Sequence, residues 1–200
     1  MRSLPLTVAL FLAAAPAQSA DWNGLYFGVH GSQELLQLDA HPGTAGLGLH
    51  VGYGLQLGEV VLGVEADADR GAVTTSNVLS PTLYWDNKTN WTGTLRGRLG
   101  LAFDSLQVYG TAGMAYRNVT TTLNRFGGIE TGTVSTPGLV YGLGADFRIL
   151  PKLDVRLEAL HYDFSGSGID WITKPGAIPA ALSNTSGDTV VRAGLSVRLN

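Results

Sequence analysis

Residues 45–57 alternate without a break between apolar side chains and small or polar ones. The apolar positions are Leu47, Leu49, Val51, Tyr53, Leu55 and Leu57, and those between them are Gly46, Gly48, His50, Gly52, Gly54 and Gln56. Successive side chains of a β-strand point to opposite faces, so this pattern predicts a strand with one oily face. A second face made mostly of glycine suits strands that curve around a narrow interior. The segment therefore predicts a wall strand of a transmembrane β-barrel.

Eight segments with this periodicity follow one another along the chain, each near the roughly 9–11 residues of a tilted membrane strand. They are residues 22–33, 45–57, 60–70, 91–103, 106–117, 138–149, 153–164 and 189–199. The connections alternate between long ones (34–44, 71–90, 118–137 and 165–188) and short ones (58–59, 104–105 and 150–152). Bacterial barrels alternate in this way between extracellular loops and periplasmic turns. The chain is therefore predicted to be all-β, an eight-stranded antiparallel up-and-down transmembrane β-barrel whose first and last strands pair.

The first 20 residues are predicted to be a signal peptide, followed by one barrel domain over residues 21–200. Arg2 precedes an apolar run over residues 4–15, and small residues follow at Ala17, Ser19 and Ala20. Cleavage after Ala17 and cleavage after Ala20 both remain open at this stage. The run is shorter than the roughly 20 residues of a membrane-spanning helix. Export implies the cell outer membrane for a barrel of this kind.

Composition excludes several classes of function. The net charge of -3 and the scattered basic residues argue against binding nucleic acid. The absence of cysteine excludes disulfides, thiolate metal sites and thiol nucleophiles. The glycines of residues 45–57 do not follow the G-x-G-x-x-G spacing of a nucleotide loop. No metal or cofactor is expected.

Strand parity places a set of charged side chains inside the barrel. They are Glu65, Asp67, Asp69, Arg96, Arg98, Arg117, Asp146, Arg148, Arg156, Glu158, Arg192 and Arg198. An unpaired buried charge costs several kcal/mol, so these groups should pair, with Glu65 and Asp67 facing Arg96 and Arg98, and Glu158 facing Arg192. The interior of an eight-stranded barrel is just wide enough for side chains, which favours a plug of ion pairs. The alternative is a narrow porin-like channel for ions or small solutes.

Exposed aromatic and basic residues in the long loops are candidate contacts with a partner. These candidates are Tyr84, Trp85, Arg125, Phe126 and Trp171. They fit either anchors for a host or surface ligand or packing against lipid headgroups. Trp22, Trp91, Phe103 and Phe164 stand near predicted strand ends, where barrels carry aromatic girdles.

Four segments together resemble a known family. Residues 21–31 read DWNGLYFGVHG and match the W-x-G-x-Y-x-G-x-x-x-G opening strand of small Gram-negative outer-membrane barrels, the opacity-like, major surface-antigen and OmpA-like proteins. Residues 91–100, 155–164 and 189–199 match further strands in order. The resemblance implies insertion by the outer-membrane assembly machinery, contact with lipopolysaccharide and other membrane lipids, and a structural and surface-interaction role without catalysis. The family usually ends on an aromatic residue, whereas this chain ends on Leu199 and Asn200.

A barrel enzyme that modifies lipid A is the alternative from another class. Lipid A deacylases are similar in carrying a His-Tyr-Ser run on a late strand, where this chain has His161, Tyr162 and Asp163. Acyl transfer requires the serine hydroxyl as nucleophile and the histidine as base. Since Asp163 replaces the serine, we expect no enzyme activity.

Overall fold

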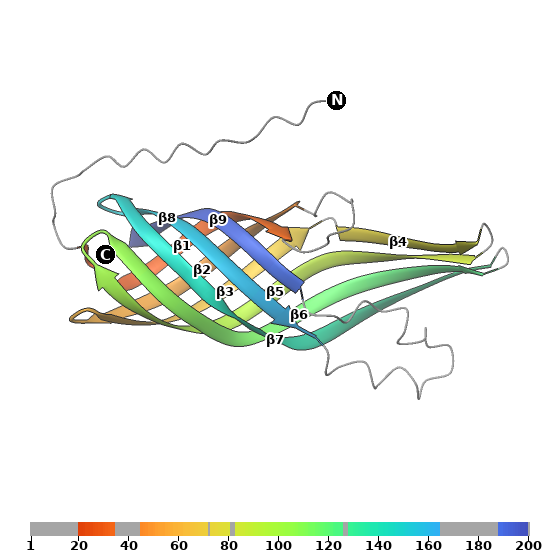
Figure 1. The fold of residues 1–200 in the computed structure, drawn as a ribbon, viewed down its shortest axis with the longest axis horizontal. Helices are drawn as coiled ribbons and strands as arrows, with labels where there is room; N and C mark the ends of the chain where they lie inside the picture. The colour runs from red at the N-terminus through yellow and green to blue at the C-terminus, as the bar shows by residue number, and fades with distance from the viewer. Residues whose placement is uncertain are drawn as a thin grey trace, which may run out of the picture.

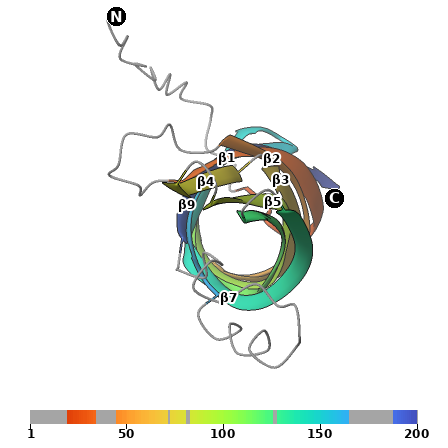
Figure 2. The ribbon, with the colours of Figure 1, turned by 90° about the vertical axis from the view of Figure 1, so that its right-hand side faces the viewer.

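A computed structural model describes residues 20–34, 45–71, 73–80, 83–125, 128–164 and 188–199. They form nine strands: β1 (Gly24–Glu34), β2 (Ala45–Leu57), β3 (Val60–Gly71), β4 (Val73–Ser80), β5 (Leu83–Phe103), β6 (Leu106–Arg125), β7 (Gly128–Leu150), β8 (Leu153–Asp163) and β9 (Asp188–Leu199). The sheet order is β3-β2-β1-β9-β8-β7-β6-β5-β4, and β3 also pairs with β5. Eight strands therefore close a ring, seen end-on in Figure 2, which confirms the predicted fold class.

Closure depends on the pairing of β1 with β9. The register runs from Leu25 opposite Leu199 to Glu34 opposite Val190, so the last strand is continuous to Leu199 despite the non-aromatic end of the chain. The predicted strand 45–57 coincides with β2. The predicted signal peptide lies outside the described residues except for Ala20. No helix among the described residues is long and apolar enough to cross a membrane.

Two of the predicted loops are wrong. Residues 73–80 and 83–90 form β4 and the start of β5, and residues 118–125 and 128–137 continue β6 and β7 beyond the ring (Figure 1). Beyond the ring the apolar alternation that marks the rest of these strands stops, while the backbone pairing continues. The result is a four-stranded extension in the order β4-β5-β6-β7. The predicted loop segments 35–44 and 165–187 lie outside the described residues.

The outward faces of the ring strands form an apolar belt. Leu47 is 76% exposed, Leu143 is 71% exposed and Leu49 is 64% exposed, although all three are large hydrophobic residues. An apolar surface of this extent around a closed ring is what acyl chains cover. Trp91 and Phe103 are exposed, Phe103 at the end of β5 and Trp91 next to Thr92, where the pairing of β5 with β3 stops, as a girdle requires. The girdle prediction is wrong for Trp22 and Phe164, whose side chains are buried.

The glycines of β2 make room for large side chains of β1. Tyr26 lies opposite Gly52 in the register and His30 lies opposite Gly48. A Cβ atom on Gly52 would stand 2.3 Å from the Tyr26 hydroxyl oxygen, and one on Gly48 would stand 2.3 Å from His30 Nε2. The glycine face of β2 is thus covered by the inward side chains of the neighbouring strand, which lie nearly flat against it.

Candidate functional site

The inside of the barrel is filled by a group of ion pairs that we call the lumen network. Its members come from β3, β5, β7, β8 and β9, and each is at most 9% exposed: Glu65, Asp67, Asp69, Arg96, Arg98, Asp146, Arg156, Glu158 and Arg192. The alternation that turns apolar residues toward lipid turns these residues inward. Burial in a confined space with both signs of charge explains why they form bonded pairs.

Glu65 on β3 is the centre of the lumen network. Its Oε1 atom lies 2.5 Å from Arg96 Nη2. Its Oε2 atom lies 3.0 Å from Arg98 Nη1 and 2.7 Å from Arg156 Nη1, and it also accepts a hydrogen bond from the Tyr26 hydroxyl at 2.8 Å. In the ring, β3 and β8 have three strands between them on either side. The pair between Arg156 and Glu65 therefore crosses the lumen from wall to wall.

Other pairs of the network also join strands that are not neighbours in the ring. Arg98 on β5 bonds Asp146 on β7 at 2.7 Å, and Arg96 on β5 reaches Glu158 on β8 at 3.3 Å. The side chains of the ring face one another across a narrow space, so a guanidinium on a long stem meets the opposite wall. Arg98 also lies over the ring of Tyr109, with its guanidinium carbon 3.6 Å from the ring centroid.

The predicted ion pair between Glu158 and Arg192 is wrong. The two residues are register partners on β8 and β9. Arg192 instead bonds Asp69 and reaches Asp67 at 3.2 Å across the lumen, where two carboxylates stand on one strand. Glu158 accepts from Arg96 and from the Tyr109 hydroxyl, 2.9 Å away. The long side chain of Arg192 therefore pairs with the strand that carries two carboxylates rather than with its register partner.

Arg148, which was predicted to belong to the lumen charge network, lies apart from it, at the end of the barrel that carries the short turn between β7 and β8. It pairs with Asp154, donates to the backbone oxygen of Asp21 at 3.2 Å, and stacks on the Trp22 ring at 4.6 Å. Asp154 is 1% exposed and also faces Arg198 at 3.5 Å. The prediction missed Asp154, although its parity matches that of Arg156. Arg117, at the other end, pairs with Asp188 at 2.5 Å.

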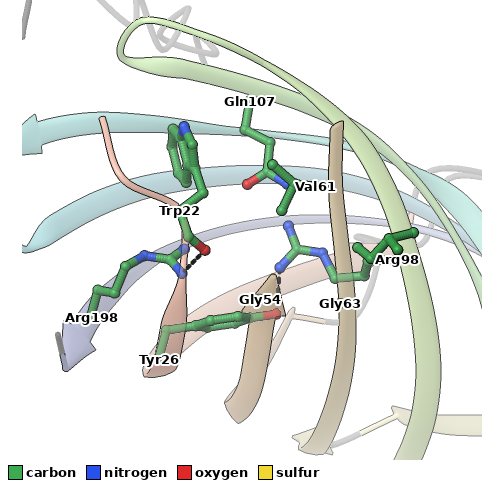
Figure 3. Close-up of a pocket in the computed structure, with 9 residues that line it drawn as sticks. Trp22, Tyr26, Gly54, Val61, Gly63, Arg98, Gln107 and Arg198 are labelled. Carbon is green, nitrogen blue, oxygen red and sulfur yellow. Dashed lines mark hydrogen bonds between the residues drawn. The ribbon is translucent and has the colours of Figure 1, made fainter. Parts of the chain in front are cut away.

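A small cavity lies between the cluster around Arg148, Asp154 and Arg198 and the lumen network (Figure 3). It is lined by the side chains of Trp22, Tyr26, Arg98, Gln107 and Arg198, among others, and its volume of about 10 Å³ suits a single water molecule. Arg198 donates to the backbone oxygen of Trp22 at 2.7 Å on one side of it. The cavity is an internal gap of one-water size between two sets of ion pairs, too small to hold a substrate.

Two buried histidines form a polar chain along the wall of β1 and β2. His30 Nδ1 lies 3.1 Å from His50 Nδ1. His30 Nε2 lies 2.9 Å from Asp69 Oδ1, and His50 Nε2 lies 2.8 Å from the Ser196 hydroxyl. Neutral rings satisfy all three contacts, because His30 then donates to the carboxylate and accepts from His50. Ser196 is 1% exposed, so this chain anchors the wall and presents no accessible nucleophile.

The predicted loop contacts fall on strands or outside the described residues. Tyr84 and Trp85 belong to the upper part of β5, and Arg125 is the last residue of β6. Phe126 and Trp171 lie outside the described residues. Of the deacylase-like run, Tyr162 points into the lumen beside Arg192, and His161 Nδ1 lies 3.0 Å from the Thr189 hydroxyl. Among the described residues no group of three or more acidic or histidine side chains is placed to hold a metal ion.

The amino-acid sequence of this chain is similar to those of known proteins. Residues 4–198 match the model of the outer membrane protein beta-barrel domain. The 22 kDa outer membrane protein of Rhizobium leguminosarum bv. viciae is 30% identical over 159 residues, which cover 78% of this chain and 71% of that protein. The 31 kDa outer-membrane immunogenic protein of Brucella melitensis biotype 1 is 30% identical over 180 residues, with 75% and 74% covered.

Two solved structures share the fold. Ail, the attachment invasion locus protein of Yersinia pestis, has a TM-score of 0.53 at 12% identity, with 88% of this chain and 97% of that chain covered. The N-terminal β-barrel domain of Pseudomonas aeruginosa OprF has a TM-score of 0.52 at 12% identity, with 88% and 98% covered. Both support the closed ring.

Proposed function

Because this chain belongs to the outer membrane protein beta-barrel domain family and is an outer-membrane β-barrel protein, we propose that it is a closed, non-conducting and non-catalytic barrel that supports the envelope and presents a surface to partners. Removal of residues 1–20 on export, and insertion by the outer-membrane assembly machinery, are part of this proposal. Lipopolysaccharide and other membrane lipids are its proposed neighbours in the bilayer.

The lumen network is the observation that carries the proposal. Ion pairs cross the interior between β3 and β8, between β5 and β8, and between β3 and β9. Moving an ion through this section requires breaking pairs whose partners are then left buried and unpaired, which costs about 3–5 kcal/mol for each one. Plugging therefore accounts for the charged interior better than a porin-like path does.

Single-channel recording in planar lipid bilayers tests the plug. The wild-type barrel is expected to give no stable current steps. A variant with both Arg156→Ala and Arg192→Ala loses two guanidinium groups that cross the lumen and leaves an excess of carboxylates, so it is expected to give small cation-selective steps. Large, stable steps from the wild-type protein would favour the porin-like alternative.

The extension of β4 to β7 is the proposed surface for partners. β5, β6 and β7 have 21, 20 and 23 residues, about twice the roughly 9–11 that span the membrane. A paired sheet holds its residues in a fixed arrangement, which favours recognition over a chain that must be ordered on binding. Ail, which shares the fold, was crystallised in complex with the heparin analogue sucrose octasulfate. By analogy we propose a ligand on the exposed part of this barrel.

Cysteine labelling tests which part of the chain is presented. The chain has no native cysteine, so single substitutions give an unambiguous signal. Ile129→Cys, at a position 69% exposed on the extension, is expected to react with a membrane-impermeant maleimide on intact cells. Leu143→Cys, at a position 71% exposed in the apolar belt, is the matched control and should stay unlabelled because lipid covers it. Equal labelling of the two cysteines would contradict the assignment of the membrane boundary.

A further inference from the structure

The outward face of β5, β6 and β7 changes character at one level of the barrel. Below this level it carries apolar residues such as Leu95, Met114 and Leu139, each more than 60% exposed. Trp91 and Tyr116 come next, 43% and 45% exposed, with their ring centroids 6.0 Å apart. Aromatic pairs of this kind lie where acyl chains give way to headgroups. Since β5 to β7 continue upward without a break, the same face then passes into the headgroup region (Figure 1).

Level with Trp91 and directly above it lies a set of amides and hydroxyls that we call the outer ladder: Asn90, Asn118, Thr120, Thr133 and Ser135. Asn90 Nδ2 donates to Asn118 Oδ1 at 2.7 Å and to the Thr120 hydroxyl at 2.9 Å. Asn118 Nδ2 donates to the Ser135 hydroxyl at 2.9 Å, and the hydroxyls of Thr120 and Thr133 are 3.0 Å apart. The bulge between Thr89 and Trp91 is what brings Asn90 into the row.

One cation stands beside this row. Lys88 is exposed and lies opposite Thr120 in the register, in the same row as Thr120 and Thr133 and one level above Asn118 and Ser135. From the belt upward, the face thus offers apolar side chains, two aromatic rings, a row of groups that both donate and accept hydrogen bonds, and an ammonium group. An amphipathic molecule with acyl chains, sugar hydroxyls and a phosphate presents the same order of chemistry.

The outer ladder continues the outward face of the apolar belt, and this continuity indicates which kind of molecule binds at the ladder. The outer ladder lies on the same outward face as the apolar belt, with Met114 four residues from Asn118 on β6 and Leu139 four residues from Ser135 on β7, so a molecule whose chains cover Met114 and Leu139 places its headgroup against the ladder. Sugar rings pack on aromatic faces, and their hydroxyls pair with amides and hydroxyls. A simple phospholipid brings the phosphate without the sugar, so it offers no sugar ring to Trp91 and Tyr116 and few hydroxyls to the donor and acceptor positions that the ladder keeps beyond its internal hydrogen bonds.

We propose that Trp91, Tyr116, the outer ladder and Lys88 together bind the headgroup of a phosphorylated glycolipid in the outer leaflet. This inference rests on the proposed function for the placement of the barrel, and it names a specific lipid contact within it. The site is an element of the wall rather than of the lumen, so it does not depend on whether the lumen conducts.

Binding of lipopolysaccharide to the folded protein in detergent micelles tests the proposal. Trp91→Leu keeps the position apolar but removes the ring, and it is expected to weaken binding about fivefold, the scale of one aromatic contact. Phe103→Leu makes the same change on the same strand at the periplasmic end, 50% exposed, and is expected to bind like the wild type. Asn118→Ala is expected to weaken binding by a similar factor to Trp91→Leu. Heat-modifiability on a gel verifies that each variant is folded.

Two further binding measurements distinguish the contribution of the phosphate from that of the sugar. Lipopolysaccharide stripped of phosphate is expected to bind the wild type more weakly than intact lipopolysaccharide, and Lys88→Gln is expected to abolish that difference. Phosphatidylglycerol is expected to bind more weakly than lipopolysaccharide and to be insensitive to Trp91→Leu. The proposal is wrong if folded Trp91→Leu and Asn118→Ala bind lipopolysaccharide as the wild type does, or if Phe103→Leu loses as much. Bilayer recordings of the wild type would be unaffected by either result.

Discussion

Glu65→Gln is expected to lower the free energy of unfolding by about 3–5 kcal/mol. The substitution keeps the size of the side chain and removes its charge. Three guanidinium groups, those of Arg96, Arg98 and Arg156, then face a neutral amide in an interior where Glu65 is 1% exposed. Removing one partner of a buried charged set is costly because the remaining charges lose compensation: the three guanidinium groups keep only Asp67, Glu158 and Asp146 as carboxylate partners.

Urea unfolding in lipid vesicles, followed by tryptophan fluorescence, measures this loss. Glu59→Gln is the matched control: Glu59 is exposed in the short turn between β2 and β3, and its substitution should change stability by less than about 0.5 kcal/mol. If Glu65→Gln unfolds at the same urea concentration as Glu59→Gln, the lumen network is solvated and does not act as a plug. The same result would weaken the case for a non-conducting barrel.

Gly28→Ala is expected to destabilise the closed barrel by about 3 kcal/mol or more, the upper range of overpacking, and to slow its folding. Gly28 lies on β1 between His50 of β2 and Ser196 of β9. A Cβ atom there would stand 2.0 Å from the backbone oxygen of Leu195 and 2.6 Å from the His50 ring. Backbone on the closing strand cannot yield without disturbing the pairing of β1 with β9, and that pairing completes the ring.

Gly31→Ala tests whether the destabilisation comes from the close contacts at Gly28 or from replacing any glycine of β1. Gly31 is on the same strand, and a Cβ atom there would meet nothing nearer than 3.9 Å. It should fold as the wild type does and keep the compact band that a closed barrel gives on an unheated gel. A Gly28→Ala protein with the same compact band and the same urea midpoint as Gly31→Ala would show that the wall adjusts around the added methyl group.

The inward placement of the charges and the pairing of Glu65 and Asp67 with Arg96 and Arg98 followed from the sequence and are confirmed, whereas the partners farther around the ring did not follow. Period-two alternation assigns each residue of a strand to a face, so Glu65, Arg156 and Arg192 were placed inward from the sequence. Partner choice depends on which strands stand opposite each other in a closed ring. The contact from Arg156 to Glu65 spans 91 residues of sequence and half the ring, and no local pattern encodes it.

The extension of β4 to β7 shows a second limit of prediction from the sequence. Its strands are rich in threonine, asparagine and serine, and they have no apolar face, so their composition resembles that of a loop. Pairing along the full length of β5, β6 and β7 decides the structure there. A backbone ladder once started in the membrane continues upward wherever the neighbouring strand supplies partners.

The sequence by itself determined the number of membrane strands, the closed antiparallel ring and the face each side chain takes, because lipid on one side and a narrow interior on the other impose a period that each strand carries locally. Only the tertiary structure decided which charges meet across the lumen, how far β5, β6 and β7 continue beyond the ring, and that Arg148 pairs with Asp154 at the end of the barrel that carries the short turns. These depend on distances across the ring, and closure sets such distances only once all eight strands are in register.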